Sequence, residues 1–129
     1  MLNDVLSAGL SKLLNAERTG KKECIVRHAS KLMANVLKLM NQQRYIGEVE
    51  VVSNTKGGYL KVQLMGKLNK CGSIKPRYAV KKTDFEKFEK RYLLAKDFGI
   101  LVVSTQQGLM THYDAKQKGV GGRLVAYAY

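Results

Sequence analysis

A short run of hydroxyl and amide side chains is the part of this sequence best suited to contact another molecule. Ser104, Thr105 and Gln106 directly follow an apolar run, Ile100–Val103, and Gly108 comes two residues later. Hydroxyl and amide groups hydrogen-bond phosphate, ribose 2′-OH and base edges, and a glycine permits close backbone approach. The same side chains can instead bond the backbone of their own turn. The residue types leave both interpretations open.

The same region also contains the residue types of a hydrolase. Ser104, His112 and Asp114 supply a nucleophile, a base and an acid, but nucleophilic catalysis requires the base within hydrogen-bond reach of the nucleophile. The chain has neither a Gly-x-Ser-x-Gly elbow nor a Gly-x-x-x-x-Gly-Lys loop for nucleotide phosphates. We expect no enzyme activity and no small-molecule substrate. A small hydrolase that uses Ser104 and His112 on an anionic substrate is the alternative.

The cysteines and histidines do not form a metal-binding pattern. Cys24 and Cys71 are 47 residues apart, without a Cys-x-x-Cys pair, and His28 and His112 are the two histidines. A structural zinc site needs four ligands at closer spacing. The sequence therefore predicts no metal, no cofactor and no disulfide framework, with two inert thiols inside the fold.

Two further features have both a structural and a functional interpretation. Gly121 and Gly122 are suited to a simple turn, or they let RNA backbone or the Ser104 segment pack closely. Ser30 is suited to cap a helix, and the same helix N-terminus with Lys31 beside it is also suited to bind a phosphate.

The charge of the chain indicates a polyanionic partner. The 129 residues carry 23 Lys+Arg against 10 Asp+Glu, a net charge of +13, and Val51–Thr83 holds eight cations and no acid. Pro76 breaks helix between Lys75 and Arg77, so we expect an extended segment that presents these cations outward. Nucleic acid is the first candidate, because Lys–phosphate contacts release counterions, and an anionic membrane surface is the second.

Membrane insertion and export are not indicated. No apolar run reaches the roughly 18 to 20 residues of a membrane span, and Met1–Leu10 lacks the basic start and apolar block of a signal peptide. We therefore expect a cytoplasmic protein without a membrane partner. The seven tyrosines are scattered along the sequence, so a base-stacking platform is not predicted, and structured RNA fits better than single strands.

Residue spacing predicts a mixed α+β fold. Apolar periodicity indicates a helix over Leu2–Ala16 ended by Gly20 and a second helix capped by Ser30, while Thr111 and Asp114 form a capping box. The remaining elements are expected strands at 24–26, 49–52, 60–64, 100–103 and 124–129, and expected helices at 84–91 and 112–118. We expect two small α/β lobes. The lobe of residues 1–66 is α-β-α-β-β, and that of residues 67–129 is mostly β with short helices.

Several segments spread along the chain together match the pattern of one known family. They are Leu14–Ala16, Ala29–Leu32, Tyr45–Gly47 and the run Ile100–Thr111, which is followed by Ala115 and Gly119–Gly122. Through these segments the sequence resembles the small-subunit ribosomal protein family S8 along essentially its whole length, and the run from Ile100 resembles the family's C-terminal signature. The segments Gly66–Gly72 and Lys75–Arg77 resemble the archaeal and eukaryotic branch, called S15a in eukaryotes.

This resemblance implies a structural protein of the small ribosomal subunit. Such a protein binds an irregular helix in the central domain of small-subunit rRNA, promotes subunit assembly and contacts neighbouring ribosomal proteins. The family's Ser-Thr-Ser loop implies RNA contact at Ser104, Thr105, Gly108 and Met110, with Gly121 and Gly122 packed behind them. Gln106 stands where the family usually has serine, and its longer reach alters that contact. Ser30 and Lys31 match the phosphate contacts of the N-terminal lobe.

Overall fold

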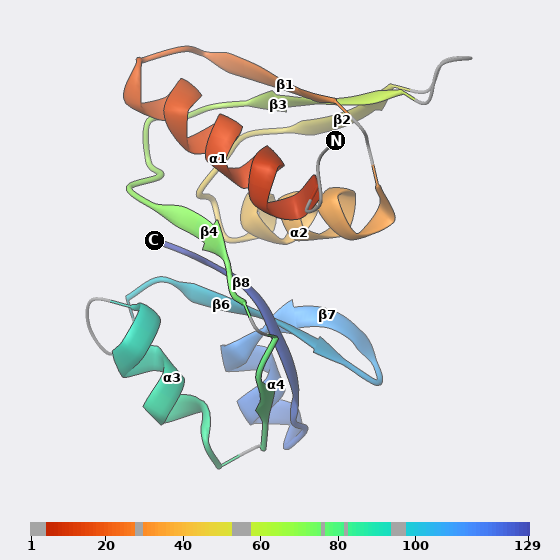
Figure 1. The fold of residues 1–129 in the computed structure, drawn as a ribbon, viewed down its shortest axis with the longest axis vertical. Helices are drawn as coiled ribbons and strands as arrows, with labels where there is room; N and C mark the ends of the chain where they lie inside the picture. The colour runs from red at the N-terminus through yellow and green to blue at the C-terminus, as the bar shows by residue number, and fades with distance from the viewer. Residues whose placement is uncertain (1–4, 28–29, 53–57, 76, 82, 94–97) are drawn as a thin grey trace. The chain divides into compact units, whose positions relative to one another are not determined.

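The computed structural model describes residues 5–27, 30–52, 58–75, 77–81, 83–93 and 98–129 (Figure 1). The chain divides into two compact units, Met1–Cys71 and Gly72–Tyr129, and each is described by itself. The division expected near residue 66 falls in the segment that joins the third and fourth strands.

The N-terminal unit has the order α-β-α-β-β, as predicted. Its elements are α1 (Val5–Arg18), β1 (Glu23–Arg27), α2 (Lys31–Gln42), β2 (Val49–Val52) and β3 (Tyr59–Gln63). The strands form an antiparallel sheet in the order β1-β3-β2. Figure 1 shows both helices on one side of this sheet. The core between these layers is fully buried and includes Leu10, Leu13, Met33, Leu37 and Leu60.

Local signals set the ends of both N-terminal helices. α1 continues to Arg18, two residues beyond the expected end, and its predicted start at residues 2–4 lies outside the described part of the chain. Gly20 then adopts a left-handed φ of 76°, and the Lys21 N–H donates to the Ala16 carbonyl at 3.0 Å. This is the glycine C-cap that the sequence predicts.

The C-terminal unit consists of an antiparallel sheet with two helices. Its elements are β4 (Cys71–Ser73), β5 (Ala79–Val80), α3 (Phe85–Tyr92), β6 (Ile100–Thr105), β7 (Gly108–Thr111), α4 (His112–Lys118) and β8 (Gly122–Ala128). The sheet order is β4-β8-β6-β7, with β5 also paired to β8. The strands β6 and β8 lie in the middle, so the apolar run that begins at Ile100 forms the core of the unit.

Helix α4 is bounded by the signals read from the sequence. The Asp114 N–H donates to Thr111 Oγ1 at 3.2 Å, and Gly119 ends the helix with a φ of 68°. In α3 the two phenylalanines, Phe85 and Phe88, are both buried, as their spacing predicts.

The sequence reading was wrong about the segment between β6 and α4. An exposed turn leading straight into a helix was expected from Ser104 onward. Instead β6 continues to Thr105, and the chain reverses and pairs as β7 before α4 begins. The residues Gly108–Thr111 show no alternation of polar and apolar side chains, and a glycine such as Gly108 weakens a strand. Pairing with β6, rather than local preference, makes them a strand.

Candidate nucleic-acid interface

The β6–β7 hairpin ends in a tight turn at the surface of the C-terminal unit. Ser104 pairs with Leu109 and Thr105 with Gly108, so Gln106 and one further residue form the turn. No non-glycine residue of this turn has a positive φ, whereas Gly108 has a φ of 110°. The reversal of the chain therefore depends on a glycine at position 108. The sequence-predicted group at positions 104–108 is brought together here.

The Thr105 hydroxyl stabilises the turn itself. Its Oγ1 donates to the Gly108 carbonyl at 2.9 Å and accepts from the Gln107 N–H at 3.1 Å. For this residue the structural interpretation, a side chain that bonds its own turn, is confirmed. The same oxygen lies 4.0 Å from Sδ of Met110. Thr105 thus fixes the shape of the turn from within.

Ser104 and Gln106 are placed differently from Thr105. Both are exposed, and within the described part of the chain neither side chain makes a hydrogen bond. A polar group that already bonds its own turn has less to offer a partner, while an exposed and unbonded hydroxyl or amide retains its full donor and acceptor capacity. These two side chains are therefore the ones that the turn presents outward.

Met110 and Gly122 support the turn from inside the unit. The Met110 side chain is buried in the core beside Val103, so it does not present itself at the surface. A Cβ at Gly122 would overlap the Ser104 carbonyl oxygen and lie 2.9 Å from a Val103 methyl. The close approach of a glycine to the Ser104 segment, one of the two interpretations left open by the sequence, is thus observed at Gly122. The neighbouring Gly121 is exposed.

Sequence reasoning missed a cation next to the turn. Arg123 of β8 is paired with Ser104 of β6 and is exposed, so these two side chains lie on the same face of neighbouring strands. Arginine forms strong charge-assisted hydrogen bonds with phosphate. The signal was the position of Arg123 directly after the glycine pair, but only the pairing of β6 with β8 brings it to Ser104.

The candidate phosphate contacts Ser30 and Lys31 lie in the N-terminal unit. The Met33 N–H donates to Ser30 Oγ at 3.1 Å, which confirms the predicted helix cap, and Lys31 is exposed on the first turn of α2. Lys75 and Arg77 belong to the C-terminal unit. Both are exposed between β4 and β5, and Pro76 lies outside the described residues. The candidate residues are therefore divided between the two units.

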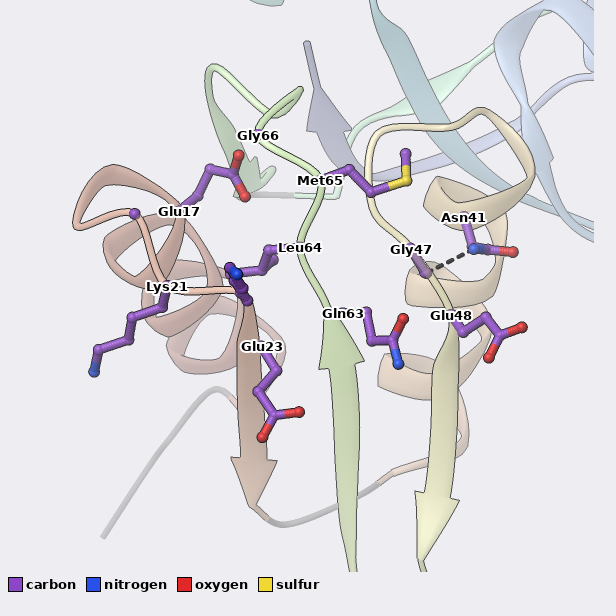
Figure 2. A pocket seen from close by; sticks show the side chains of 12 residues that line it. Glu17, Lys21, Glu23, Asn41, Gly47, Glu48, Gln63, Leu64, Met65 and Gly66 are labelled. Atoms are coloured by element: carbon purple, nitrogen blue, oxygen red, sulfur yellow. Dashed lines mark hydrogen bonds between the residues drawn. The ribbon is translucent and has the colours of Figure 1, made fainter.

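A groove of about 940 Å³ in the N-terminal unit does not resemble a phosphate site (Figure 2). Three carboxylates, those of Glu17, Glu23 and Glu48, line it and outnumber its two lysines, Lys21 and Lys22. Figure 2 shows Lys21 extending away from its centre, and the Asn41 amide donates to the Gly47 carbonyl at 2.6 Å. Carboxylates repel a polyanion. We do not assign RNA contact to this groove.

The hydrolase alternative lacks its base. His112 is completely buried, and its Nδ1 accepts from the Leu101 N–H at 3.0 Å. Its Nε2 lies 3.2 Å from the buried carboxylate of Glu89, which also pairs with Lys116. His112 is therefore enclosed in the core of the unit with its Nδ1 occupied, and it is not available to activate the exposed Ser104.

Both cysteines are buried and free. Burial raises the pKa of the Cys71 thiol to about 12 and also raises the pKa of Cys24, so both thiols are poor nucleophiles. Among the described residues, no three His, Cys, Asp or Glu side chains are grouped so that they could hold a metal ion. His28 lies outside the described residues.

Three tyrosines of the C-terminal unit are in ring contact, although the tyrosines are scattered along the sequence. Tyr92 stacks on Tyr127 with ring centroids 5.7 Å apart, and Tyr127 stacks on Tyr129 at 6.4 Å. Spacing along the chain hides this contact, because Tyr92 comes from α3 and the other two from the C-terminal strand and its end.

A comparison with known families agrees with the resemblance seen in the sequence. The family model described as ribosomal protein S8 matches residues 4–129. In the part of the chain that the structure describes, no helix has both the length and the apolar character needed to cross a bilayer. Because the match covers nearly the whole chain, this protein belongs to the ribosomal protein S8 family, whose members are small-subunit ribosomal proteins that bind rRNA.

Proposed function

We propose that this protein recognises an irregular helix in the central domain of small-subunit rRNA and thereby promotes assembly of the subunit. The β6–β7 turn selects the site. The observation that carries this assignment is the exposed Ser104 hydroxyl, which has no hydrogen bond within the described residues and lies beside Arg123. An exposed, uncharged turn that is held rigid by its own hydrogen bonds is suited to recognise the shape and the polar base edges of folded RNA.

The residues of the turn divide into those that contact RNA and those that hold the turn in place. Ser104 and Gln106 contact the RNA directly. Thr105 and Gly108 set the turn through the 2.9 Å hydrogen bond between them and the positive φ of Gly108. Met110, Gly121 and Gly122 support the turn from its inner side. Because Gln106 is longer than the serine usual in the family, it reaches a more distant group on the RNA.

Cations on other surfaces add affinity without choosing the site. Arg123 contacts a phosphate beside the group bound by Ser104. Ser30, Lys31, Lys75 and Arg77 contact further phosphates, each neutralised phosphate releasing counterions. The acidic groove of Figure 2 stays free of RNA. Neighbouring small-subunit proteins are the remaining partners, and the protein acts in the cytoplasm as part of the subunit. We assign it to the archaeal and eukaryotic branch.

Replacement of Ser104 tests the role of the turn. Ser104→Ala removes one exposed hydroxyl, and we expect specific rRNA binding to weaken by about 1–3 kcal/mol, the cost of one lost polar contact that leaves its partner unsatisfied. Binding to unrelated RNA should not change. The measurement is equilibrium binding of the full chain to a central-domain rRNA fragment and to a competitor RNA of equal length.

A serine of the N-terminal unit supplies the matched control. Ser11 is exposed on α1, so Ser11→Ala removes the same group from the other unit. It should leave both affinities unchanged. If Ser104→Ala weakened both RNAs equally, or weakened neither, the turn would not be the selecting element.

A further inference from the structure

Six aromatic rings of the C-terminal unit are linked to one another in a row. Its members are connected by ring contacts at centroid distances of 5.5–6.4 Å and by one guanidinium. In order of contact they are Phe88, Tyr78, Arg91, Tyr92, Tyr127, Tyr129 and Phe98. We call this set the aromatic row. Its six rings come from four different places in the sequence.

Secondary structure explains how the row forms. Phe88, Arg91 and Tyr92 are spaced i, i+3, i+4 on α3 and therefore share one face of that helix. Tyr127 lies in β8 and Tyr129 directly follows this strand, and with a spacing of two residues both side chains lie on the same face of the sheet. A Cβ at Gly72 would come within 3.0 Å of the Tyr127 hydroxyl oxygen, so a glycine in β4 makes room for this ring.

The rings at the two ends of the aromatic row differ in exposure. Phe88 is 8% exposed, the tyrosines are half-buried, and Phe98 is 41% exposed. None of the four tyrosine hydroxyls in the row makes a hydrogen bond within the described part of the chain. The row therefore begins at the buried Phe88 and ends at the exposed ring of Phe98, and its tyrosine hydroxyls remain available to a partner.

Two cations lie over the part of the row that runs from Phe88 to Tyr92. The Arg91 guanidinium lies 5.3 Å from the Tyr78 ring centroid and 5.8 Å from that of Tyr92. The Lys87 ammonium lies 5.8 Å from the centroid of Phe88. An open ring binds an unpaired nucleotide by stacking on its base, and cations further along the row, such as Arg91 beside Tyr92, attract the phosphates of the strand that continues from that base.

The aromatic row is separate from the β6–β7 turn. Ser104 is paired with Arg123 on β8, whereas Tyr127 is paired with Leu101. Four residues of strand separate Arg123 from Tyr127, which is roughly 13 Å at the rise of a β-strand. An RNA held by the turn can therefore reach the row only with a second part of its surface.

We propose that the exposed end of the aromatic row, formed by Phe98 and Tyr129, is a second RNA-contact surface that stacks an unpaired base of the rRNA. This surface adds to the contact made by the β6–β7 turn and does not depend on the role of Ser104. Stacking on an aromatic ring requires a π face and tolerates any base. Phe98 supplies the open face, and Tyr129, with its ring centroid 5.9 Å away, supports it from the inner side.

Two substitutions at Phe98 separate stacking from apolar contact. Phe98→Leu retains an apolar side chain and removes the ring, while Phe98→Tyr retains the ring. For the full chain binding small-subunit rRNA, we expect Phe98→Leu to weaken affinity about tenfold and Phe98→Tyr to stay within about twofold. Ile25→Ala is the matched control, because Ile25 is 42% exposed on β1 of the other unit, and it should have no effect.

Photocrosslinking identifies the contact directly. Small-subunit rRNA substituted with 4-thiouridine should crosslink to peptides that contain Phe98 or Tyr129, and Phe98→Leu should remove these crosslinks. Unchanged affinity of Phe98→Leu, without crosslinks at the row, would overturn the proposal. It would also be overturned if Phe98→Leu bound RNA normally but failed to admit a neighbouring protein during subunit reconstitution. Ser104→Ala, measured in parallel, shows whether a failure concerns only the row or also the turn.

Discussion

The cation-rich stretch Val51–Thr83 and the hairpin segment Ile100–Thr111 are opposites in composition and in construction. The first carries eight cations and no acid, and the second contains no charged residue at all. In its described part, the stretch includes the last two residues of β2, the strand β3, and two short strands, β4 with three residues and β5 with two. The hairpin is held by paired strands and by the Thr105 hydroxyl at its turn.

This difference shows how one small chain can separate affinity from selectivity. Charge attracts any RNA and depends weakly on geometry, so it can be carried by a loosely patterned segment. Selection of one RNA site requires polar groups held in fixed positions, because a misplaced donor gains nothing from the correct partner. The hairpin therefore requires the more exact geometry. Two glycines make that geometry possible, Gly108 through its positive φ and Gly122 through its close contact with the Ser104 segment.

The largest expected effect tests whether the cation-rich stretch is packed at all. Its single cysteine, Cys71, has its pKa raised by burial to about 12 from 9.0. At pH 8 its thiolate fraction, and hence its reaction with a disulfide reagent such as DTNB, should be about a thousandfold below that of an exposed thiol. In urea both cysteines should react fully, and Cys71→Ser assigns the slower signal.

The same thiol gives a pH dependence of stability. The pKa of Cys71 is higher in the folded chain than in the unfolded chain. The buried neutral thiol therefore makes its full contribution to the free energy of unfolding below pH 9, and this contribution is lost as the pH rises towards 12. Cys71→Ser should therefore show a smaller loss of unfolding free energy between pH 8 and pH 10. Rapid reaction of Cys71 in native buffer would mean that this part of the stretch is not packed. The stretch and the hairpin would then differ in how well they are folded, and not only in their charge.

The next effect tests the demand for fixed geometry in the hairpin. A Cβ at Gly122 would overlap the Ser104 carbonyl oxygen, so Gly122→Ala must push β6 and β8 apart. We expect a loss of about 2–3 kcal/mol in the free energy of unfolding, measured by urea denaturation. Specific rRNA binding of the folded fraction should fall as well, because Ser104 moves, while binding to unrelated RNA should persist.

A second glycine serves as the control for this prediction. Gly119 ends α4 with a φ of 68° and has nothing within 4 Å of its Cβ position. Asparagine tolerates the left-handed conformation, so Gly119→Asn should cost less than about 1 kcal/mol and leave specific binding intact. Equal effects at both glycines would contradict a special role for the contact with Ser104.

Most of the helices were predictable because their signals are local. Ser30 and Thr111 each cap a helix by accepting from a backbone N–H three residues later, and Gly119 stops one by adopting a positive φ. Each of these signals lies within a few residues of the helix end that it sets. The α-β-α-β-β order of the N-terminal unit follows from them and from alternation in β2 and β3.

The short strands and the gathered side chains were not predictable in this way. β4, β5 and β7 have two to four residues each and acquire their structure from pairing with β8 or β6. The burial of Met110, the pairing of Arg123 with Ser104 and the row through Tyr92 and Tyr127 join residues distant in sequence. The candidate turn was found from residue types alone, but which of its side chains face outward depends on the bonds of Thr105.

The smallest expected effect concerns the cations. Arg77→Gln replaces an exposed charge between β4 and β5 with a polar side chain of similar length. We expect binding to weaken by a similar factor of a few for rRNA and for unrelated RNA. The slope of log K against log salt should fall by about one unit or less, because one phosphate contact is lost.

This result is informative only beside a variant of the turn. Ser104→Ala should change the ratio of specific to non-specific affinity and leave the salt slope unchanged, since no charge is removed. Arg77→Gln should change the slope and leave the ratio unchanged. If Arg77→Gln lowered the ratio as strongly as Ser104→Ala, the cation-rich stretch would also take part in selection. Affinity and selectivity would then be properties of both regions, which would contradict the assignment of affinity to the stretch and of selectivity to the hairpin.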